Sequence, residues 1–279
     1  MLSFLLTYVG MPFLVLSSTL DIELNAQFAK NALLCVALSL LFSFGVFFLT
    51  KPLCKYLKDE KKEGMMRFCM TFANNGFLGI PLATAVFGNS LTVTYLVIIN
   101  VVDSVLRYTT GVYLISGDRK MISPKKVIFS PALIAFVIGI LFNLLNAHEY
   151  VPELKKFSDS FSDIVTPLCM TILGMKLGGV KLTSLFKLKR TYYVSVWKLL
   201  LFPIVAMALF YVGDLLFDMG KEPVFAALIA FGTPVAALST AFADQFDGDM
   251  EGAVTYTLSS TVFSVATIPI LYWVLSLIV

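Results

Sequence analysis

The sequence predicts an all-α integral membrane protein. Of its 279 residues, 58% are hydrophobic and only 14% are charged, whereas a soluble domain carries about 25% charged residues. Six stretches of at least 20 residues contain no Asp, Glu, Lys or Arg, and a helix of about 20 residues crosses the apolar core of a bilayer. The runs lack the alternating pattern of a membrane β-barrel, so we expect helices to satisfy the backbone in lipid.

Nine membrane crossings are expected, each from its own stretch of sequence. The first has no basic residues before its apolar run and is followed by Asp21 and Glu23, so it is a crossing rather than a cleavable signal peptide. Four crossings contain no charged residue, and the other five contain one or two each. In chain order they are residues 2–20, 27–50, 65–87, 91–116, 127–147, 157–175, 191–213, 224–243 and 252–278.

The charges of the connecting loops predict the orientation in the membrane. One set of alternate loops carries fifteen Lys and Arg residues, and the opposite set carries four. Because basic loops stay in the cytoplasm, the first set is expected inside, with Met1 inside and Val279 outside. We therefore expect a multi-pass protein of the cell membrane.

Composition argues against metal, redox and enzyme chemistry. Four cysteines, Cys35, Cys54, Cys69 and Cys169, lie in or beside apolar runs without paired spacing, so they are expected as small buried hydrophobic residues. His148 is the only histidine, and no pair of intramembrane aspartates or zinc motif supplies a catalytic group. No enzyme activity, metal site, cofactor or nucleic-acid partner is expected.

The chain contains a weak internal repeat. The segment Gly79–Pro81, Gly-Ile-Pro, recurs 153 residues later as Gly232–Pro234, Gly-Thr-Pro. Pro12, within one apolar run, recurs 155 residues later as Pro167 in another. Matching prolines in matching crossings predict two structural halves of the kind found in transporters.

The repeat predicts how the chain is divided. Residues 1–117 form a first repeat with four of its five crossings, residues 118–126 a short cytoplasmic linker, and residues 127–279 a second repeat of five crossings. The partner of the crossing at 127–147 would fall before Met1. We therefore expect ten crossings in the natural protein, with the first absent here, in two five-helix repeats that are inverted because five is odd.

The recurring prolines predict two broken helices. A proline inside a helix removes an N–H donor and clashes with the carbonyl four residues back, here at Phe77 for Pro81 and at Ala230 for Pro234. Gly79 and Gly232 would ease the unusual backbone angles. Helices broken at matching places in two repeats are typical of transport sites, where free N–H groups suit an anionic substrate. Two ordinary proline kinks are the alternative.

Polar residues beside these breaks are the candidate binding residues. Asn74 and Asn75 carry carboxamides that can donate to a carboxylate or to freed backbone carbonyls, and the alternative is that they join neighbouring helices. Thr233 lies at the second break, where joining helices is the favoured role of its hydroxyl. The candidate binding residues are Asn74, Asn75, Gly76, Gly79, Pro81, Gly232, Thr233 and Pro234.

Charged residues inside predicted crossings are the remaining candidates. Asp103 and Arg107 are one helical turn apart, so they can neutralise each other as a structural pair; a role in proton coupling or substrate attraction is the alternative. Lys198 has no partner in its own crossing. It can extend to the cytoplasmic interface, or pair with a substrate or with Asp163 of the preceding crossing.

The stretch Phe72–Leu82 reads FANNGFLGIPL and resembles the auxin efflux carrier family, whose pattern there is close to F-x-N-x-G-F-L-G-x-P. Shorter matches at residues 8–12, 131–135, 166–168 and 234–236 extend the resemblance over the whole chain. Only about ten residues join the two halves, so the chain resembles the short, bacterial members rather than the plant hormone carriers.

The resemblance implies a ten-helix carrier whose fourth and ninth helices are broken and cross around a site for organic anions. The matching residues are Asn74, Pro81 and Pro234. It also implies a scaffold part, a moving part and a homodimer. The expected function is secondary transport of a small organic anion, such as a dicarboxylate, by alternating access, with proton coupling if Asp103 titrates. The alternative is a membrane sensor or partner-binding protein that keeps a carrier fold without transporting.

Overall fold

The computed structural model describes residues 2–20, 22–88, 90–122, 129, 131–145, 152–178 and 188–279. The linker residues 123–126 and His148, singled out above, lie outside these ranges. Regular structure over the described residues is entirely helical, apart from one isolated β-bridge. Within those ranges, four helices are long and apolar enough to cross a membrane: Ala26–Cys54, Leu91–Ser116, Lys189–Phe217 and Met250–Ser276. The chain is thus an all-α membrane protein, while nine crossings and the inverted repeat stay predictions.

The helices follow one another with short connections, and the label η marks π-helices together with the single 3₁₀-turn η4. In chain order they are α1 (Leu2–Leu5), η1 (Leu6–Gly10), α2 (Met11–Leu20), α3 (Ala26–Cys54), α4 (Glu60–Thr71), η2 (Asn75–Gly79), α5 (Ile80–Phe87), α6 (Leu91–Leu106), η3 (Arg107–Gly111), α7 (Val112–Ser116), η4 (Arg119–Met121), α9 (Pro131–Leu144), α11 (Pro152–Ser162), α12 (Val165–Gly178), α14 (Lys189–Val196), η5 (Trp197–Leu201), α15 (Phe202–Phe217), α16 (Lys221–Gly232), α17 (Ser239–Gln245) and α18 (Met250–Ser276).

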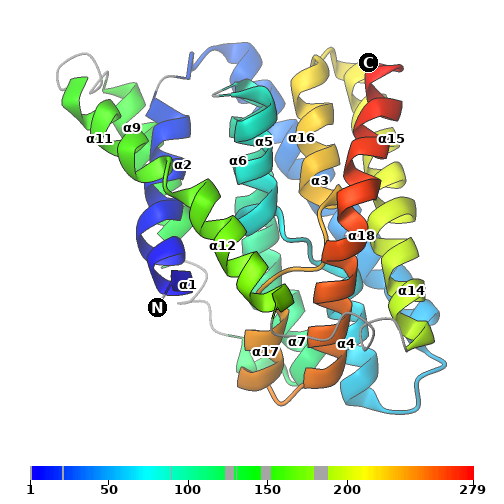
Figure 1. Cartoon of the computed structure of the whole chain (residues 1–279). Helices are drawn as coiled ribbons and strands as arrows, with labels where there is room; N and C mark the ends of the chain where they lie inside the picture. The colour runs from blue at the N-terminus through cyan, green and yellow to red at the C-terminus, as the bar shows by residue number, and fades with distance from the viewer. Residues whose placement is uncertain are drawn as a thin grey trace.

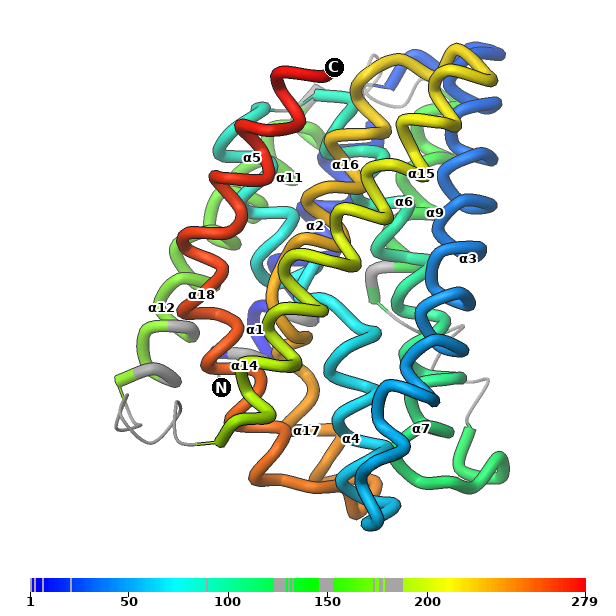
Figure 2. Tube along the Cα trace, turned by 90° about the vertical axis from the view of Figure 1, so that its right-hand side faces the viewer, coloured from blue at the N-terminus to red at the C-terminus, as the bar shows by residue number. Residues whose placement is uncertain are grey.

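The helices form two bundles (Figure 1). The smaller bundle consists of α1, η1, α2, α9, α11 and α12, with α2 packed against both α9 and α11. The larger bundle contains the other helices, and Figure 2 shows α3, α15 and α18 running along its height. Contacts between the bundles include α2 with α6 and α12 with α5. Each bundle contains helices from both halves of the chain.

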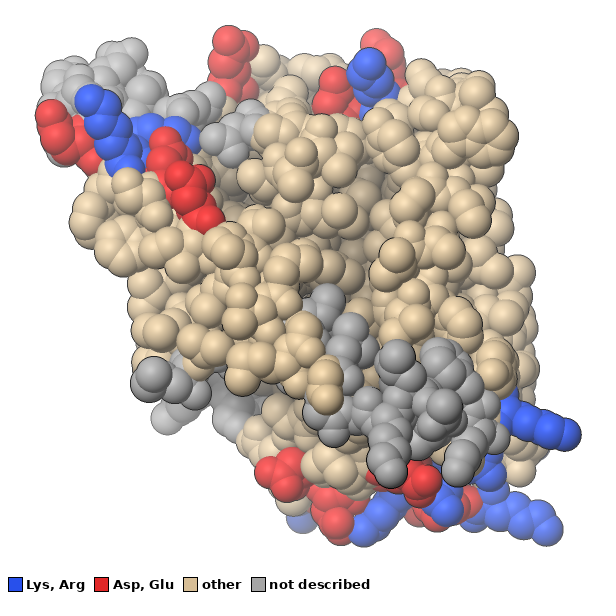
Figure 3. Space-filling view, in the orientation of Figure 1, with Lys and Arg blue, Asp and Glu red and all other residues tan. Residues whose placement is uncertain are grey.

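Charged side chains lie mainly at the two ends of the molecule, with an apolar belt between them (Figure 3). Large hydrophobic side chains in this belt point outward: Phe48 on α3 is 68% exposed and Val265 on α18 is 77% exposed. A soluble protein buries such residues, so the belt is the surface that lipid covers. The end formed by α4, α7 and α17 is the one that the loop charges predict to be cytoplasmic.

Asn143 joins α9 to α2 in the smaller bundle. Its buried carboxamide donates to the backbone oxygens of Thr19, Leu20 and Ile22 at distances of 2.8 to 2.9 Å. The last carbonyls of a helix receive no hydrogen bond from an N–H group of that helix. Inside a membrane, where water is absent, another group must donate to them. Asn143, which belongs to the neighbouring helix α9, therefore caps the C-terminal end of α2.

Prolines account for three of the four π-helices in the described chain. The helices η1, η2 and η5 each end two residues before a proline, at Pro12, Pro81 and Pro203. Because a proline cannot donate to the carbonyl four residues back and its ring presses against it, the preceding turn widens. The fourth, η3, begins at Arg107 and has no proline.

The crossing predicted over residues 157–175 is wrong as a single helix. The structure has α11 up to Ser162 and α12 from Val165, with a turn at Asp163 and Ile164 between them. The reason is Pro167, which cannot bond to the carbonyl of Asp163 and crowds it. Here the missing hydrogen bond ends a helix instead of widening a turn.

Candidate functional site

Two non-helical segments meet inside the larger bundle. The first, Phe72–Asn74, separates α4 from η2, and the second, Thr233–Leu238, separates α16 from α17. We call these two segments the crossover. The N–H of Asn74 donates to the oxygen of Pro234 at 2.8 Å, and the N–H of Ala236 donates to the oxygen of Phe72 at 3.1 Å. The freed peptide groups thus satisfy one another, as they must away from water.

The crossover lies in a different place from the predicted first break. We expected the interruption at the Phe77 carbonyl, but the chain is helical there and extended at Phe72. The wide turn of η2 absorbs the donor missing at Pro81, so the helix continues through the proline. The second segment contains Pro234 itself, and the hydroxyl of Ser260 on α18 accepts from the N–H of Val235 at 3.1 Å.

The role expected for the two glycines is also wrong. Gly79 has ordinary helical angles, with φ of −64° and ψ of −52°, and Gly232 has no positive φ. A β-carbon on Gly79 would lie 3.4 Å from the methyl of Thr233. That distance is an ordinary van der Waals contact, so neither backbone angles nor close packing requires a glycine at position 79.

A buried cluster of charged and amide groups joins α6 to the crossover. Asp103 and Arg107 form an ion pair, and both are more than 90% buried. The amide of Asn75 donates to Asp103 at 3.2 Å, and its oxygen accepts from Arg107 at 3.3 Å. Arg107 also donates to the oxygen of Ala73 at 3.4 Å. Asn75 thus joins helices, as the alternative interpretation of this residue proposed.

Lys198 lies beside this cluster, in η5. Only 2% of the residue is exposed, and its ammonium donates to the oxygen of Thr71 at 3.4 Å. The carbonyls that end a helix carry partial negative charge, so the end of α4 attracts a cation. Extension of Lys198 to the interface is therefore wrong, and Asp163 is exposed in the turn of the smaller bundle rather than paired with it.

A cavity of about 90 Å³ lies next to the first non-helical segment. We call it the crossover cavity. It is lined from the larger bundle by the start of η2, one face of α6 and η3, and the second non-helical segment, and from the smaller bundle by one residue each of α2 and α9. The lining residues are Met11, Ala73, Asn74, Gly76, Phe77, Asn100, Ser104, Arg107, Tyr108, Pro131, Ala236, Ala237 and Leu238.

The crossover cavity has the chemistry of an anion site. The first N–H groups of a helix have no acceptor inside it and carry partial positive charge, and the helix that begins at Asn75 starts at the cavity wall. Arg107 lines the same cavity, and among the described residues its buried Nε has no hydrogen-bond partner. The two donors can hold a carboxylate together.

Of the residues predicted from sequence to bind substrate, Asn74 and Gly76 line the crossover cavity. The others, Asn75, Gly79, Pro81, Gly232, Thr233 and Pro234, surround or build the crossover without lining this cavity. Sequence reasoning missed Asn100 and Ser104. Their signal was present, because residues 100, 104 and 107 recur at the spacing of one helical face.

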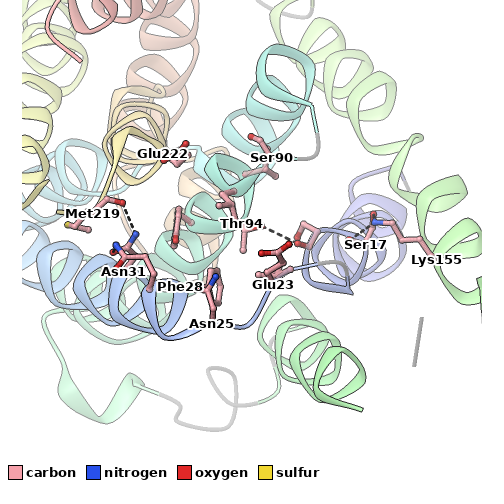
Figure 4. A pocket seen from close by; sticks show the side chains of 16 residues that line it. Ser17, Glu23, Asn25, Phe28, Asn31, Ser90, Thr94, Lys155, Met219 and Glu222 are labelled. Carbon is pink, nitrogen blue, oxygen red and sulfur yellow. Dashed lines mark hydrogen bonds between the residues drawn. The ribbon is translucent and has the colours of Figure 1, made fainter. Parts of the chain in front are cut away.

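A second pocket, of about 400 Å³, lies where α2 ends and where α3, α6 and α16 begin (Figure 4), at the end opposite to α4 and α17 (Figure 1). We call it the outer pocket. Its wall is polar and comes from both bundles, with Ser17 and Lys155 on one side and Glu222 and Asn31 on the other. The hydroxyl of Thr94 on α6 donates to the oxygen of Ser18 on α2 at 3.1 Å and so links the bundles below it.

Comparison with known proteins identifies the family. A family model described as membrane transport protein matches residues 1–272. The chain belongs to this family. The match confirms the resemblance to the auxin efflux carriers that the Phe72–Leu82 segment indicated, and it identifies a family of transporters rather than of enzymes.

Two archaeal relatives support the membership. An uncharacterized transporter of Methanocaldococcus jannaschii is 25% identical over 275 residues, which is 96% of this chain and 87% of that protein. An uncharacterized transporter of Methanothermobacter thermautotrophicus is 28% identical over 215 residues, 76% of this chain and 68% of that protein. The similarity covers both non-helical segments of the crossover in the first relative, whose match spans almost the whole chain.

Proposed function

We propose that this member of the membrane transport protein family is a secondary carrier for a small organic anion, and that the crossover cavity binds the anion's carboxylate. The observation that carries the proposal is the unpartnered Nε of Arg107, buried among the described residues at the wall of a cavity where a helix begins. An isolated buried donor is costly, so a ligand that accepts from it gains affinity. Asn74 supplies a further donor at the same wall.

Alternating access between the two bundles is part of the proposal. Both the outer pocket and the crossover cavity are lined by residues of both bundles, so a shift of one bundle against the other would change access to both. The Thr94 to Ser18 hydrogen bond is among the contacts that such a shift would break. The interrupted helices, the inverted repeats, the homodimer and the cell membrane as location belong to the same proposal.

Transport by reconstituted protein tests the proposal. The purified protein is reconstituted into liposomes that contain one unlabelled short organic acid. Uptake of the same acid in labelled form is then measured, one acid at a time. Asn74→Ala is expected to reduce the flux of the accepted acid at least several-fold, because it removes a donor from the cavity. Gly76→Ala is expected to do the same, because its β-carbon would lie 3.3 Å from the Asn100 side-chain oxygen.

Thr84→Ala is the matched control, because the Thr84 hydroxyl lies on the same interrupted helix and bonds only its own turn, at the Ile80 oxygen. It is expected to transport like the parent protein. Unchanged flux in both Asn74→Ala and Gly76→Ala would refute the binding site. Saturable binding of an acid without any flux would favour the alternative function, a sensor on a carrier fold.

A further inference from the structure

We infer that Lys198 sets the charge of the substrate at a single negative unit, so that the site prefers small monocarboxylates to dicarboxylate dianions. The inference rests on the proposed function and adds the substrate class. It follows from two observations: the number of charges buried at the crossover, and the scarcity of other charges near them in the described chain.

The buried cluster contains two cations and one carboxylate. Asp103 is paired with Arg107, and Lys198 is fully enclosed beside them, near enough for the charges of Asp103 and Arg107 to act on its ammonium. The hydrogen bond from Lys198 to the Thr71 oxygen satisfies one donor but brings no opposite charge. With Lys198 protonated, the cluster therefore carries a surplus of one positive charge.

On the helices that surround the buried cluster, the other charged residues lie mainly near the helix ends. In the described sequence they are the first four residues of α4, Arg67 of α4, which pairs with Glu63, the first two residues of α14, Asp214 in the last turn of α15 and the exposed Asp244 of α17. In α16 and α18 they occupy only the first two positions, and α5 contains none. The surplus charge of the cluster is thus not cancelled by a neighbouring helix.

A buried charge without a counter-charge is unfavourable, and one anion in the adjoining cavity removes the surplus. A monocarboxylate on Arg107 brings the cluster to zero net charge, whereas a dicarboxylate dianion leaves it at minus one.

Substitutions that change the charge of the cluster without changing its shape test the inference. Lys198→Gln lowers the surplus to zero and is expected to weaken monocarboxylate binding roughly tenfold, the order of magnitude for loss of one nearby unit charge at an effective dielectric constant of about 20. Lys198→Arg keeps the charge and is expected to restore binding. Asp103→Asn raises the surplus to two and is expected to shift preference toward dianions.

The measurement is ligand affinity of the purified full-length protein in detergent at pH 7, where malonate is a dianion, by titration calorimetry with propionate as the monoanion and malonate as the dianion. Parent protein preferring propionate, loss of this preference in Lys198→Gln and its retention in Lys198→Arg support the inference. Parent protein preferring malonate, or a Lys198→Gln variant with unchanged propionate affinity, overturns it. If Asp103→Asn does not fold, the two Lys198 variants still decide.

The outcome also separates this inference from the proposed function. If carboxylates bind and are transported without regard to the charge at position 198, only the inference fails. If neither propionate, malonate nor any other short organic acid binds to the parent protein or is transported by it, the proposed function fails as well.

Discussion

At the scale of single residues, the site is organised around Arg107. One nitrogen of its guanidinium donates to Asp103, Asn75 and the backbone of Ala73, while its buried Nε has no partner in the described chain. The pairing with Asp103 was predictable because the two residues are one turn apart. The contact of Lys198 with Thr71 was not, because it depends on a carbonyl freed by the end of a helix far away in the sequence.

Gly64 gives a prediction about packing. A β-carbon at this position of α4 would overlap the backbone oxygen of Leu114 on α7. Backbone cannot move aside as a flexible side chain does, so Gly64→Ala is expected to destabilise the protein by about 1 to 3 kcal/mol, the usual range for overpacking. The measurement is the melting temperature of the purified protein in detergent.

Gly45 is the matched control for Gly64. It also lies inside a helix, α3, but a β-carbon there meets nothing within 4 Å. Gly45→Ala is expected to leave the melting temperature unchanged or to raise it, because alanine favours helix more than glycine does. Equal melting temperatures for the two variants would contradict the close packing of α4 against α7.

At the scale of elements, prolines shape the helices in two ways. Pro12, Pro81 and Pro203 follow a widened turn and leave the helix continuous, whereas Pro167 follows a turn between two helices. Of these four, the sequence predicted a disturbed helix only at Pro81, although the missing donor is a local property of every proline. The sequence could not predict whether a helix would widen or end at a proline, since that depends on whether neighbouring helices and side chains satisfy the freed carbonyl.

The π-helix η5 gives a prediction about the site. Pro203 ends the widened turn that carries Lys198, and Pro203→Ala restores a donor for the Leu199 carbonyl. The turn is then expected to tighten and to move Lys198 away from the Thr71 oxygen. Carboxylate affinity, measured by calorimetry, is expected to fall in the same direction as in Lys198→Gln, with the protein still folded.

Pro269 serves as the control for Pro203. It also lies inside a long helix, α18, but it is exposed on the outer surface and no π-helix precedes it. Pro269→Ala is expected to bind carboxylates like the parent protein. A fall in affinity of similar size in both variants would mean that proline replacement acts through general stability rather than through η5.

At the scale of the whole molecule, the two bundles do not follow the two halves of the chain. The smaller bundle combines α2 with α9, α11 and α12, and the larger bundle combines α3 to α7 with α14 to α18. The sequence predicted the membrane class and several crossings from composition, and it placed Asn74 and Gly76 at the site. It did not reveal which helices pack together, because lipid-facing and protein-facing apolar residues have similar composition.

Orientation in the membrane gives a prediction for the whole molecule. All four cysteines are buried, so the parent protein is expected to react little with a membrane-impermeant maleimide. Lys221→Cys, at the start of α16, is expected to react in intact cells. Lys61→Cys, in α4, lies at the opposite end with its side chain 57% exposed, and it is expected to react only after the cells are permeabilised.

The reverse labelling pattern would contradict the predicted orientation, and labelling of both variants in intact cells would contradict a bilayer between the two ends. Lys61 forms an exposed ion pair with Asp247 at 2.5 Å. Such pairs contribute at most about 1 kcal/mol, so the substitution leaves the fold intact and the labelling interpretable.

The links between the two non-helical segments run through peptide groups, from Asn74 to Pro234 and from Ala236 to Phe72, so among substitutions at the two donors only proline removes one directly. A chain cut between the two segments would leave each part with unpaired peptide groups in the apolar interior, where each such group costs several kcal/mol. We therefore expect neither part to be stable in the membrane without the other.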